Sequence, residues 1–460
     1  MLTSRTVRKA SVIGAALGSC VAASMLLKNA ARKRRNRSLQ PNQTIIIAGA
    51  GFAGLNVAQE LARLLPGDNE GHIRLIDRNN FLLFTPMLTE VAGGELDARH
   101  IVAPPRQLSP RINFEQGDIR EIRLPEKTVV LDAGPQGGPQ RTIKADHIVI
   151  ALGSVAEYHD IPGLREHSYA MKSIADAVSL RNQIFRSLEQ ARWETDAKRR
   201  REILTFVVGG GGFTGVETMA AVNDLVRGSL RHYPGVRADE VTTIIIEPGE
   251  RLLAEITPDL AAYAREKLEE HGVQVLLKTK IASAAADFVE TEDGKHIPTR
   301  TLIWAGGVTA NPLAAGLKCP HGRHGTIVVD HSLQVTGLPG IWALGDCAQV
   351  PKPSHGSYGP TAQNATREGA LVARNIVAVM RGEKPRPFDF KTIGEVALVG
   401  RHSAVAKIYG RRFCGFPAWA MWRAIYLSKM PGAAQRSRIF ADWMLDLIFG
   451  RSVSEVPIVH

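Results

Sequence analysis

The chain has 460 residues, which suggests two or three domains, and its 44% hydrophobic content is ordinary for an α/β protein with sizeable cores. Its four cysteines are too few and too scattered for a disulfide scaffold, and they suit a reducing compartment. Because no CxxC pair occurs, the sequence indicates neither a metal site nor a dithiol centre.

The net charge of +12 is concentrated at the two ends of the chain. Residues 1–40 carry nine Lys or Arg and no acid, and residues 381–460 carry thirteen Lys or Arg against six acids. Nucleic acid is one reason for basic ends, but apolar and aromatic residues accompany the charge at both of them. The pattern therefore favours a negatively charged membrane surface, with no nucleic-acid partner.

The leader, residues 1–40, contains an uncharged run of seventeen residues over 11–27, which is the short limit for a transmembrane helix. The heavier positive flank follows this run, so the catalytic part would lie on the cytoplasmic side if the segment spans a membrane. An organellar transit peptide, which would allow an organellar inner membrane, also fits. A lipoprotein box at 17–20 and a cleaved secretory signal remain alternatives.

The first candidate site follows an apolar strand expected over 45–48. Gly49, Gly51 and Gly54 have the spacing GxGxxG and open an amphipathic helix. In this spacing the glycines permit a tight turn, close approach to a pyrophosphate, and close helix–strand packing, in that order. The diphosphate would lie at the helix N-terminus, and Asp77, which ends the next strand, would accept a ribose hydroxyl. The order of elements predicts a nucleotide site.

An apolar, glycine-rich segment at 81–97 follows, either lying over a cofactor or packed as a crossover loop. Strands are expected near 112–131 and over 147–154, the latter ending in Gly153. Strand, glycines and helix then recur with Gly210, Gly212 and Gly215, and a later strand ends in Glu247. This carboxylate would accept an unmodified ribose and repel a 2′-phosphate, so NADH is favoured over NADPH, although nearby Arg251 weakens that preference.

Two further strand ends carry glycines. Residues 301–308 form an expected strand that leads to Gly306, and residues 341–351 form one that ends in Gly345-Asp346. Their separation predicts that the first domain resumes after the second, which is then an insertion. Asp346 would reach a flavin's ribityl chain or phosphates, or it would simply form an Asx turn or a helix N-cap.

Two amphipathic helices are expected in the last eighty residues. One carries Trp419, Trp422 and Tyr426 at helical spacing; the second carries Ile439, Trp443 and Leu447, with Phe440, Met444 and Ile448 beside them. The accompanying cations are Arg423, Lys429, Arg436 and Arg438. Such stripes predict an interfacial helix pair whose Trp419, Trp422, Trp443 and Phe440 enter a membrane surface. A helical hairpin that forms a core or a dimer contact is the alternative.

Together these motifs resemble the two-dinucleotide-domain flavoproteins, and within them the type II NADH:quinone oxidoreductases. The resemblance runs from about 43 to 450 through GAGFAG, GFTGVE, IWAGGV, ALGDCA and PTAQNATREGALVARNI, in the family's order. It implies hydride transfer from NADH to FAD and then electron transfer to a membrane quinone, ubiquinone or menaquinone, without proton pumping. A reductase of a protein acceptor and a non-catalytic NADH-binding membrane flavoprotein are the alternatives.

The resemblance also assigns residues. Glu217 matches a glutamate beside the nicotinamide and flavin, and Gln363 belongs to the quinone-site pair Ala362-Gln363; where the family has another glutamine, this chain has Arg367. The remaining candidates for the FAD site are Gly49, Gly51, Phe52, Ala53, Gly54, Asp77, Arg78, Gly153, Asp346 and Ala362. Those for the NADH site are Gly210, Gly212, Gly215, Glu247 and Gly306.

The expected fold is therefore α/β, with two Rossmann-like dinucleotide-binding domains, the second inserted in the first, and a C-terminal membrane-associating helical region. The expected ranges are 41–170 and 300–385 for the FAD-binding domain, 171–299 for the NADH-binding domain and 386–460 for the C-terminal region. A homodimer is compatible with the same aromatic surface.

Overall fold

The computed structural model describes residues 43–65, 72–108, 111–133 and 138–456, so the expected leader lies outside the described residues. The first fold is built on a seven-stranded sheet whose first five strands are parallel and whose last two are antiparallel. In sheet order the strands are β20 (Ile341–Ala343), β8 (His147–Ile150), β1 (Ile45–Ala48), β2 (Ile73–Asp77), β5 (Asn113–Arg123), β6 (Thr128–Ala133) and β7 (Arg141–Lys144).

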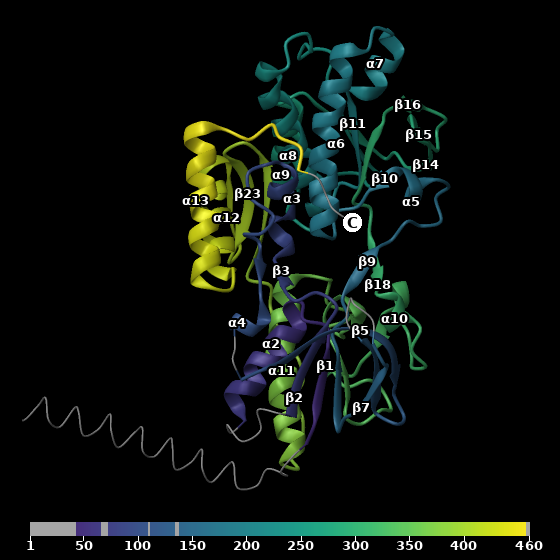
Figure 1. Cartoon of the computed structure of the whole chain (residues 1–460), viewed down its shortest axis with the longest axis vertical. Coiled ribbons are helices and arrows are strands. Elements are labelled where there is room, and N and C mark those ends of the chain that lie inside the picture. The colour runs from purple at the N-terminus through teal and green to yellow at the C-terminus, as the bar shows by residue number, and fades with distance from the viewer. Residues whose placement is uncertain (1–42, 66–71, 109–110, 134–137, 457–460) are drawn as a thin grey trace, which may run out of the picture.

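Strand β1 lies in the middle of the parallel part, and all four of its residues are completely buried. A continuous apolar run is required there because both faces of a parallel sheet are covered. Helices α2 (Phe52–Leu64) and α11 (Ala362–Met380) pack against each other beside this sheet (Figure 1). They cross closely because Gly369 leaves room, since a Cβ there would lie 2.6 Å from the carbonyl oxygen of Ala53.

The second fold has a five-stranded parallel sheet. Its strands, in order, are β10 (Ser168–Tyr169), β17 (Thr301–Trp304), β11 (Thr205–Gly209), β12 (Thr242–Glu247) and β13 (Val273–Leu277). Helices α6 (Ile174–Trp193), α8 (Phe213–Ser229) and α9 (Pro258–Glu270) surround it, and β14 (Ile281–Ala284), β15 (Phe288–Thr291) and β16 (His296–Pro298) form a small antiparallel sheet. Since β10 and β17 belong to this sheet, it extends beyond the expected range 171–299 at both ends.

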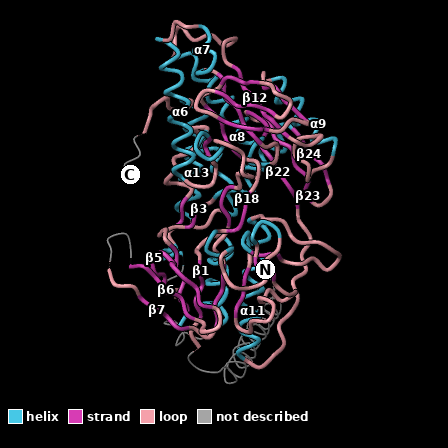
Figure 2. Tube along the Cα trace, turned by 90° about the vertical axis from the view of Figure 1, so that its right-hand side faces the viewer, coloured by secondary structure: helices cyan, strands magenta, loops and turns pink. Residues whose placement is uncertain are grey.

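The second fold is inserted in the first, as expected. Strands β8 and β20 pair side by side, although 190 residues lie between Ile150 and Ile341, and those residues include the whole second fold. The two connecting segments are themselves paired, as the antiparallel strands β9 (Ser154–Ala156) and β18 (Val308–Ala310). Figure 2 shows the two sheets in opposite halves of the molecule, with β18 between them. This antiparallel pair of strands connects the two folds directly.

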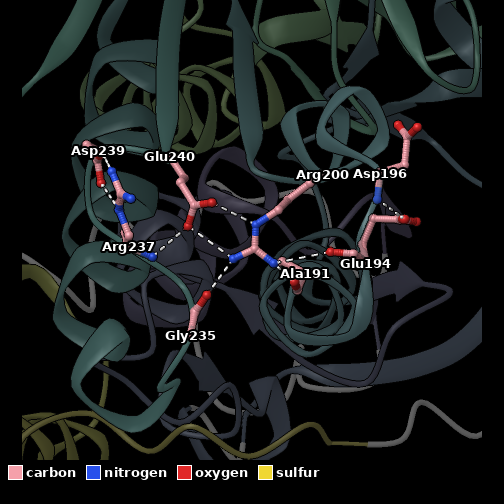
Figure 3. A network of polar contacts seen from close by, with 8 residues as sticks. All are labelled: Ala191, Glu194, Asp196, Arg200, Gly235, Arg237, Asp239 and Glu240. Atoms are coloured by element: carbon pink, nitrogen blue, oxygen red, sulfur yellow. Dashed lines mark hydrogen bonds and ion pairs between the residues drawn. The ribbon is translucent and has the colours of Figure 1, made fainter.

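A partly exposed network of polar contacts joins three segments of the second fold. Arg200, in α7 (Ala197–Ile203), forms a two-point ion pair with Glu240 at 2.8 and 3.0 Å and also donates to the carbonyl oxygens of Ala191, Glu194 and Gly235 (Figure 3). One planar guanidinium therefore joins the end of α6, helix α7 and the 235–240 loop. The fork of donors that arginine presents suits such a junction.

The expected C-terminal helices are α12 (Gly415–Lys429) and α13 (Ala433–Phe449). They follow a three-stranded antiparallel sheet, β22 (Gly394–Gly400), β23 (Ser403–Ile408) and β24 (Arg411–Cys414), which packs on α8 and α9. Figure 1 shows this region in yellow beside the second fold. Among the described residues, no helix is both long and apolar enough to cross a membrane.

The 81–97 segment is packed rather than extended over open space. It forms β3 (Leu82–Leu83), the short helix η2 (Thr85–Met87) and α3 (Leu88–Ala92). Most of its apolar side chains join the core shared by α6, α8 and α12, while Leu82 joins the core of the first fold. The remaining short elements are β4 (Val102–Ala103), α4 (Pro105–Leu108), α5 (Leu164–His167), η3 (Leu230–His232), α10 (Pro312–Ala315), η4 (Arg323–Gly325), β19 (Ile327–Val328), η5 (Gly345–Cys347) and β21 (Ala348–Gln349).

Candidate functional site

The two glycine turns have the same geometry. Gly49 and Gly210 both adopt positive φ, +105° and +108°, where a residue with a Cβ is strained. A Cβ on Gly54 would lie 1.9 Å from the carbonyl oxygen of Gly49, and one on Gly215 would lie 1.8 Å from that of Gly210. Only glycine allows each helix to approach its strand this closely, so the expected roles of these four residues in the turns are met.

The middle glycines mark where a pyrophosphate would fit. A Cβ added to Gly51 or Gly212 meets no atom within 4 Å, so the backbone is open to a ligand at both positions. Neither α2 nor α8 has a side-chain N-cap bond, and neither has an acid in its first turn. The N–H groups at both helix starts therefore suit an anion, and the residues present fit a dinucleotide diphosphate at each.

The acids at the ends of β2 and β12 make corresponding contacts. Asp77 Oδ2 accepts a hydrogen bond from Ala50 N at 2.7 Å, and Glu247 Oε2 accepts one from Gly211 N at 2.6 Å. Burial raises the pKa of Asp77, while the backbone donors oppose this shift. Each carboxylate oxygen keeps a further lone pair, so both side chains can still accept a ribose hydroxyl beside the glycine turn.

The other candidates of the first fold lie around the same strand ends. Phe52 and Ala362 begin α2 and α11, and Ala53 is buried beneath the turn at Gly345. Gly153, with φ of +70°, follows β8 and borders open space. Arg78 is different, because its exposed side chain pairs with exposed Asp118 at 3.3 Å. The remaining candidate of the second fold, Gly306, follows β17, and a Cβ on Gly210 would lie 2.8 Å from its nitrogen.

Two carboxyl groups meet at the turn of Gly345 and Asp346: that of Asp346 itself and that of Glu368 in α11. Asp346 Oδ2 accepts a hydrogen bond from Ser154 Oγ at 2.7 Å, and Glu368 Oε2 accepts one from Gly345 N at 2.7 Å. Burial, with the charge of Asp346 adding to it, raises the pKa of Glu368 to about 7. The sequence did not single out Ser154 or Glu368, and no local pattern indicated that Glu368 of α11 contacts the Gly345 turn.

Glu217 lies in the first half of α8 and is nearly inaccessible. Its Oε1 accepts two hydrogen bonds of 3.1 Å, from Leu398 N in β22 and from Trp422 Nε1 in α12. Burial raises the pKa of Glu217 to about 7, although both donors favour the ionised form. A carboxyl group with such a pKa can gain or lose a proton near neutral pH, which is a property of functional acids and bases.

Four aromatic rings connect this glutamate to the first fold. Trp422 contacts Tyr426 at 4.5 Å between ring centroids, Tyr426 contacts Phe84 at 6.2 Å, and Phe84 contacts Phe52 at 5.5 Å. Burial raises the pKa of the Tyr426 hydroxyl, with Glu217 adding to this effect. The 81–97 segment and α12 thus lie between the start of α2 and Glu217, a connection that no sequence motif indicated.

Gln363 lies in the first turn of α11 and is half-buried. Its Oε1 accepts from Ile393 N at 3.1 Å, and its Nε2 donates to the carbonyl oxygen of Gly394 at 3.3 Å. The side chain therefore already links α11 to β22, and one amide hydrogen is left for another acceptor. Arg367, one turn on, stacks its guanidinium on Phe390 at 4.2 Å.

The expectation that Trp422 and Trp443 enter a membrane surface is wrong. Trp422 is fully buried beside Glu217, and Trp443 is 6% exposed. Arg423 does not face outward either: it lies between the rings of Trp419 and Trp443, 4.5 Å from each, and pairs with Glu95 at 2.8 Å. Helical periodicity identified one stripe on α12 and two on α13, but not which of these residues face the core.

The fold and the paired sites define an oxidoreductase with two dinucleotide-binding domains. Residues 43–369 match the pyridine nucleotide-disulphide oxidoreductase family, and residues 393–452 match the NDH2 C-terminal domain. The chain is 30% identical to the type II NADH:quinone oxidoreductase Ndh of Mycobacterium tuberculosis, over 88% of each chain. It belongs to the pyridine nucleotide-disulphide oxidoreductases and, within them, to the type II NADH:quinone oxidoreductases.

Two further comparisons agree. A probable NADH dehydrogenase of Dictyostelium discoideum is 28% identical over 94% of this chain and 95% of its own length. The structure of NDH2 from Plasmodium falciparum in complex with NADH matches 90% of this chain and 99% of that one, with a TM-score of 0.82 and 20% identity. At that identity the likeness concerns the fold alone. The family uses FAD and NADH, which the two glycine turns accommodate.

Proposed function

We propose that this protein oxidises NADH and reduces a membrane quinone, with FAD bound at the first fold and NADH at the second. The chemistry that bound FAD supplies is acceptance of a hydride from NADH and transfer of two electrons to a quinone. The observation that carries the proposal is a connection between the two folds. Glu217 of the NADH domain accepts a hydrogen bond from Trp422, and the aromatic contacts of Trp422 continue through Tyr426 and Phe84 to the FAD domain.

The residues of this chain would bind, align and control protons. The turns at Gly51 and Gly212 would hold the two diphosphates, and Asp77 and Glu247 would accept the ribose hydroxyls. Asp346 would accept from the ribityl hydroxyls of the flavin. Gly153, Gly306 and Ala362 line the strand and helix ends where the reactive rings would meet, while exposed Arg78 lies at the edge of the adenosine end.

Two side chains are assigned to the reacting end. Glu217, whose pKa lies near 7, would hold or release a proton where NADH meets the flavin. Gln363 would donate its remaining amide hydrogen to a quinone carbonyl. Its two backbone contacts preorganise the amide, which is the usual requirement for a positioned donor.

The test is steady-state NADH oxidation by the purified protein with short-chain ubiquinone and menaquinone analogues. We expect flavin absorbance, NADH-dependent bleaching of it, and quinone-dependent turnover. A protein that bleaches with NADH but transfers electrons only to a protein acceptor would support the reductase alternative. A flavoprotein that binds NADH without turnover would be the non-catalytic alternative, and both results would overturn the proposal.

Membrane association is a further part of this proposal, and the outer face of α13 is the surface that supports it. Its exposed apolar side chains are Phe440, Met444, Leu445, Leu447, Ile448 and Phe449, and Phe416 at the start of α12 is also exposed. A contiguous exposed apolar stripe marks an interaction surface. Arg436 and Arg438 are exposed on the same helix, and each would contribute about 1 kcal/mol near an anionic bilayer.

Vesicle co-sedimentation tests this surface in the full chain and in a chain without residues 1–40. Replacing Phe440, Leu447 and Ile448 by serine should strongly reduce binding to anionic vesicles, while FAD content is retained. Trp193→Ser is the matched control, because Trp193 is 82% exposed on the second fold. If the triple variant binds as before, or if a dimer dissociates instead, α13 is a subunit contact.

A further inference from the structure

One lysine that the reaction above does not use lies where the two folds meet. Lys172 immediately precedes Ser173, the N-cap of α6. Its backbone N–H donates to Asp176 Oδ2 at 3.0 Å, and the Ser173–Asp176 capping box fixes the same turn. The backbone that carries this side chain is therefore held firmly at the beginning of the second fold.

The side chain of Lys172 reaches the first fold through one hydroxyl. Its Nζ donates to Ser154 Oγ at 3.2 Å, and Ser154 Oγ donates to Asp346 Oδ2 at 2.7 Å. Because a hydroxyl has one hydrogen, Ser154 must accept from the lysine in order to donate to the carboxylate. The hydrogen bonds thus run in one direction, from the ammonium group to Asp346.

Two carboxyl groups and the Lys172 ammonium group lie at this contact between the folds. Asp346 and Glu368 both lie at the Gly345 turn, and Lys172 is the cation whose hydrogen bonds lead to it. Burial lowers the pKa of Lys172, and Asp346 opposes that shift. A positive charge that is partly removed from water acts more strongly on its neighbours than one at the surface.

We propose that Lys172 is a positioning residue for the flavin: through Ser154 it fixes the Asp346 carboxylate, and its charge favours the reduced flavin. Two-electron reduction leaves more negative charge on a bound flavin, so a cation that is linked by hydrogen bonds to Asp346 would stabilise that form. The proposal rests on the proposed function only in assigning FAD to the first fold. It goes beyond it by naming a residue of the other fold that sets the cofactor's redox balance.

The test is the flavin midpoint potential, measured by spectroscopic titration against a reference dye, with no NADH or quinone present. Lys172→Gln keeps a donor for Ser154 but removes the charge, and it should shift the two-electron equilibrium at least tenfold toward oxidised flavin, about 30 mV. Lys172→Arg should stay within threefold of the unmutated protein. Lys144→Gln, an exposed charge loss on the first fold, should do the same.

Ser154→Ala tests the positioning half separately. It cuts the link to Asp346 but leaves the charge, so the Kd for FAD should rise at least tenfold while the potential changes little; it also decides the matter if Lys172→Gln does not fold. An unchanged potential in folded Lys172→Gln, or an unchanged Kd in Ser154→Ala, overturns the proposal. An unmutated protein that binds no flavin would instead refute the proposed function.

Discussion

Glu217→Gln should change how stability depends on pH. The folded pKa of about 7 lies above the ordinary 4.5 because burial disfavours the charged form. A raised carboxyl pKa gives stability that is fully present below pH 4.5 and is lost as pH rises to about 7. The difference corresponds to about 3 kcal/mol, at ~1.4 kcal/mol for each pH unit. Glutamine keeps an acceptor for Leu398 and Trp422 but does not titrate.

Equilibrium urea unfolding at pH 4.5 and pH 8, with FAD in excess, measures this difference. The free energy of unfolding of Glu217→Gln relative to the unmutated protein should rise by about 3 kcal/mol between these pH values. Glu368 also has a pKa of about 7, but it is present in both proteins and cancels. Glu250→Gln, which removes an exposed carboxyl, is the matched control. A relative stability of Glu217→Gln that does not vary with pH would refute the assignment of a neutral buried carboxyl.

Three other predictions concern nucleotide specificity, the quinone site and the ion pairs that Arg423 and Arg451 form with Glu95. Glu247→Gln should lower the kcat/KM preference for NADH over NADPH, and equal efficiencies in the unmutated protein would contradict the role of this acid. Gln363→Leu should slow quinone reduction in stopped-flow while flavin reduction by NADH stays nearly unchanged; loss of both half-reactions would make it purely structural. Arg423→Met removes one of the two buried arginines that pair with Glu95, the other being Arg451, and it should cost about 3 kcal/mol by urea unfolding, whereas exposed Arg438→Met should cost little. Equal effects of the two arginine substitutions would show that the buried pairs contribute nothing.

The nucleotide sites could be predicted from the sequence because their geometry is local. Gly49, Gly51 and Gly54 shape one turn between a strand and the helix that follows it, and Asp77 ends the next strand of the same unit. Spacing along the chain fixes such a unit, and its repetition at Gly210 made the assignment stronger. The insertion of one fold in the other followed from the order of these units.

Only the tertiary structure determined which faces of the helices are buried and which side chains, distant in the sequence, come into contact. The chain's periodicity gave α13 two apolar stripes, but only packing against α3 and α12 determined that Ile439 and Trp443 are buried and Phe440 is exposed. Likewise, Glu217 and Trp422 are 205 residues apart, and their contact depends on how the C-terminal sheet docks on α8. Such contacts arise from the closure of long loops around a shared core, and no local pattern in the sequence records them.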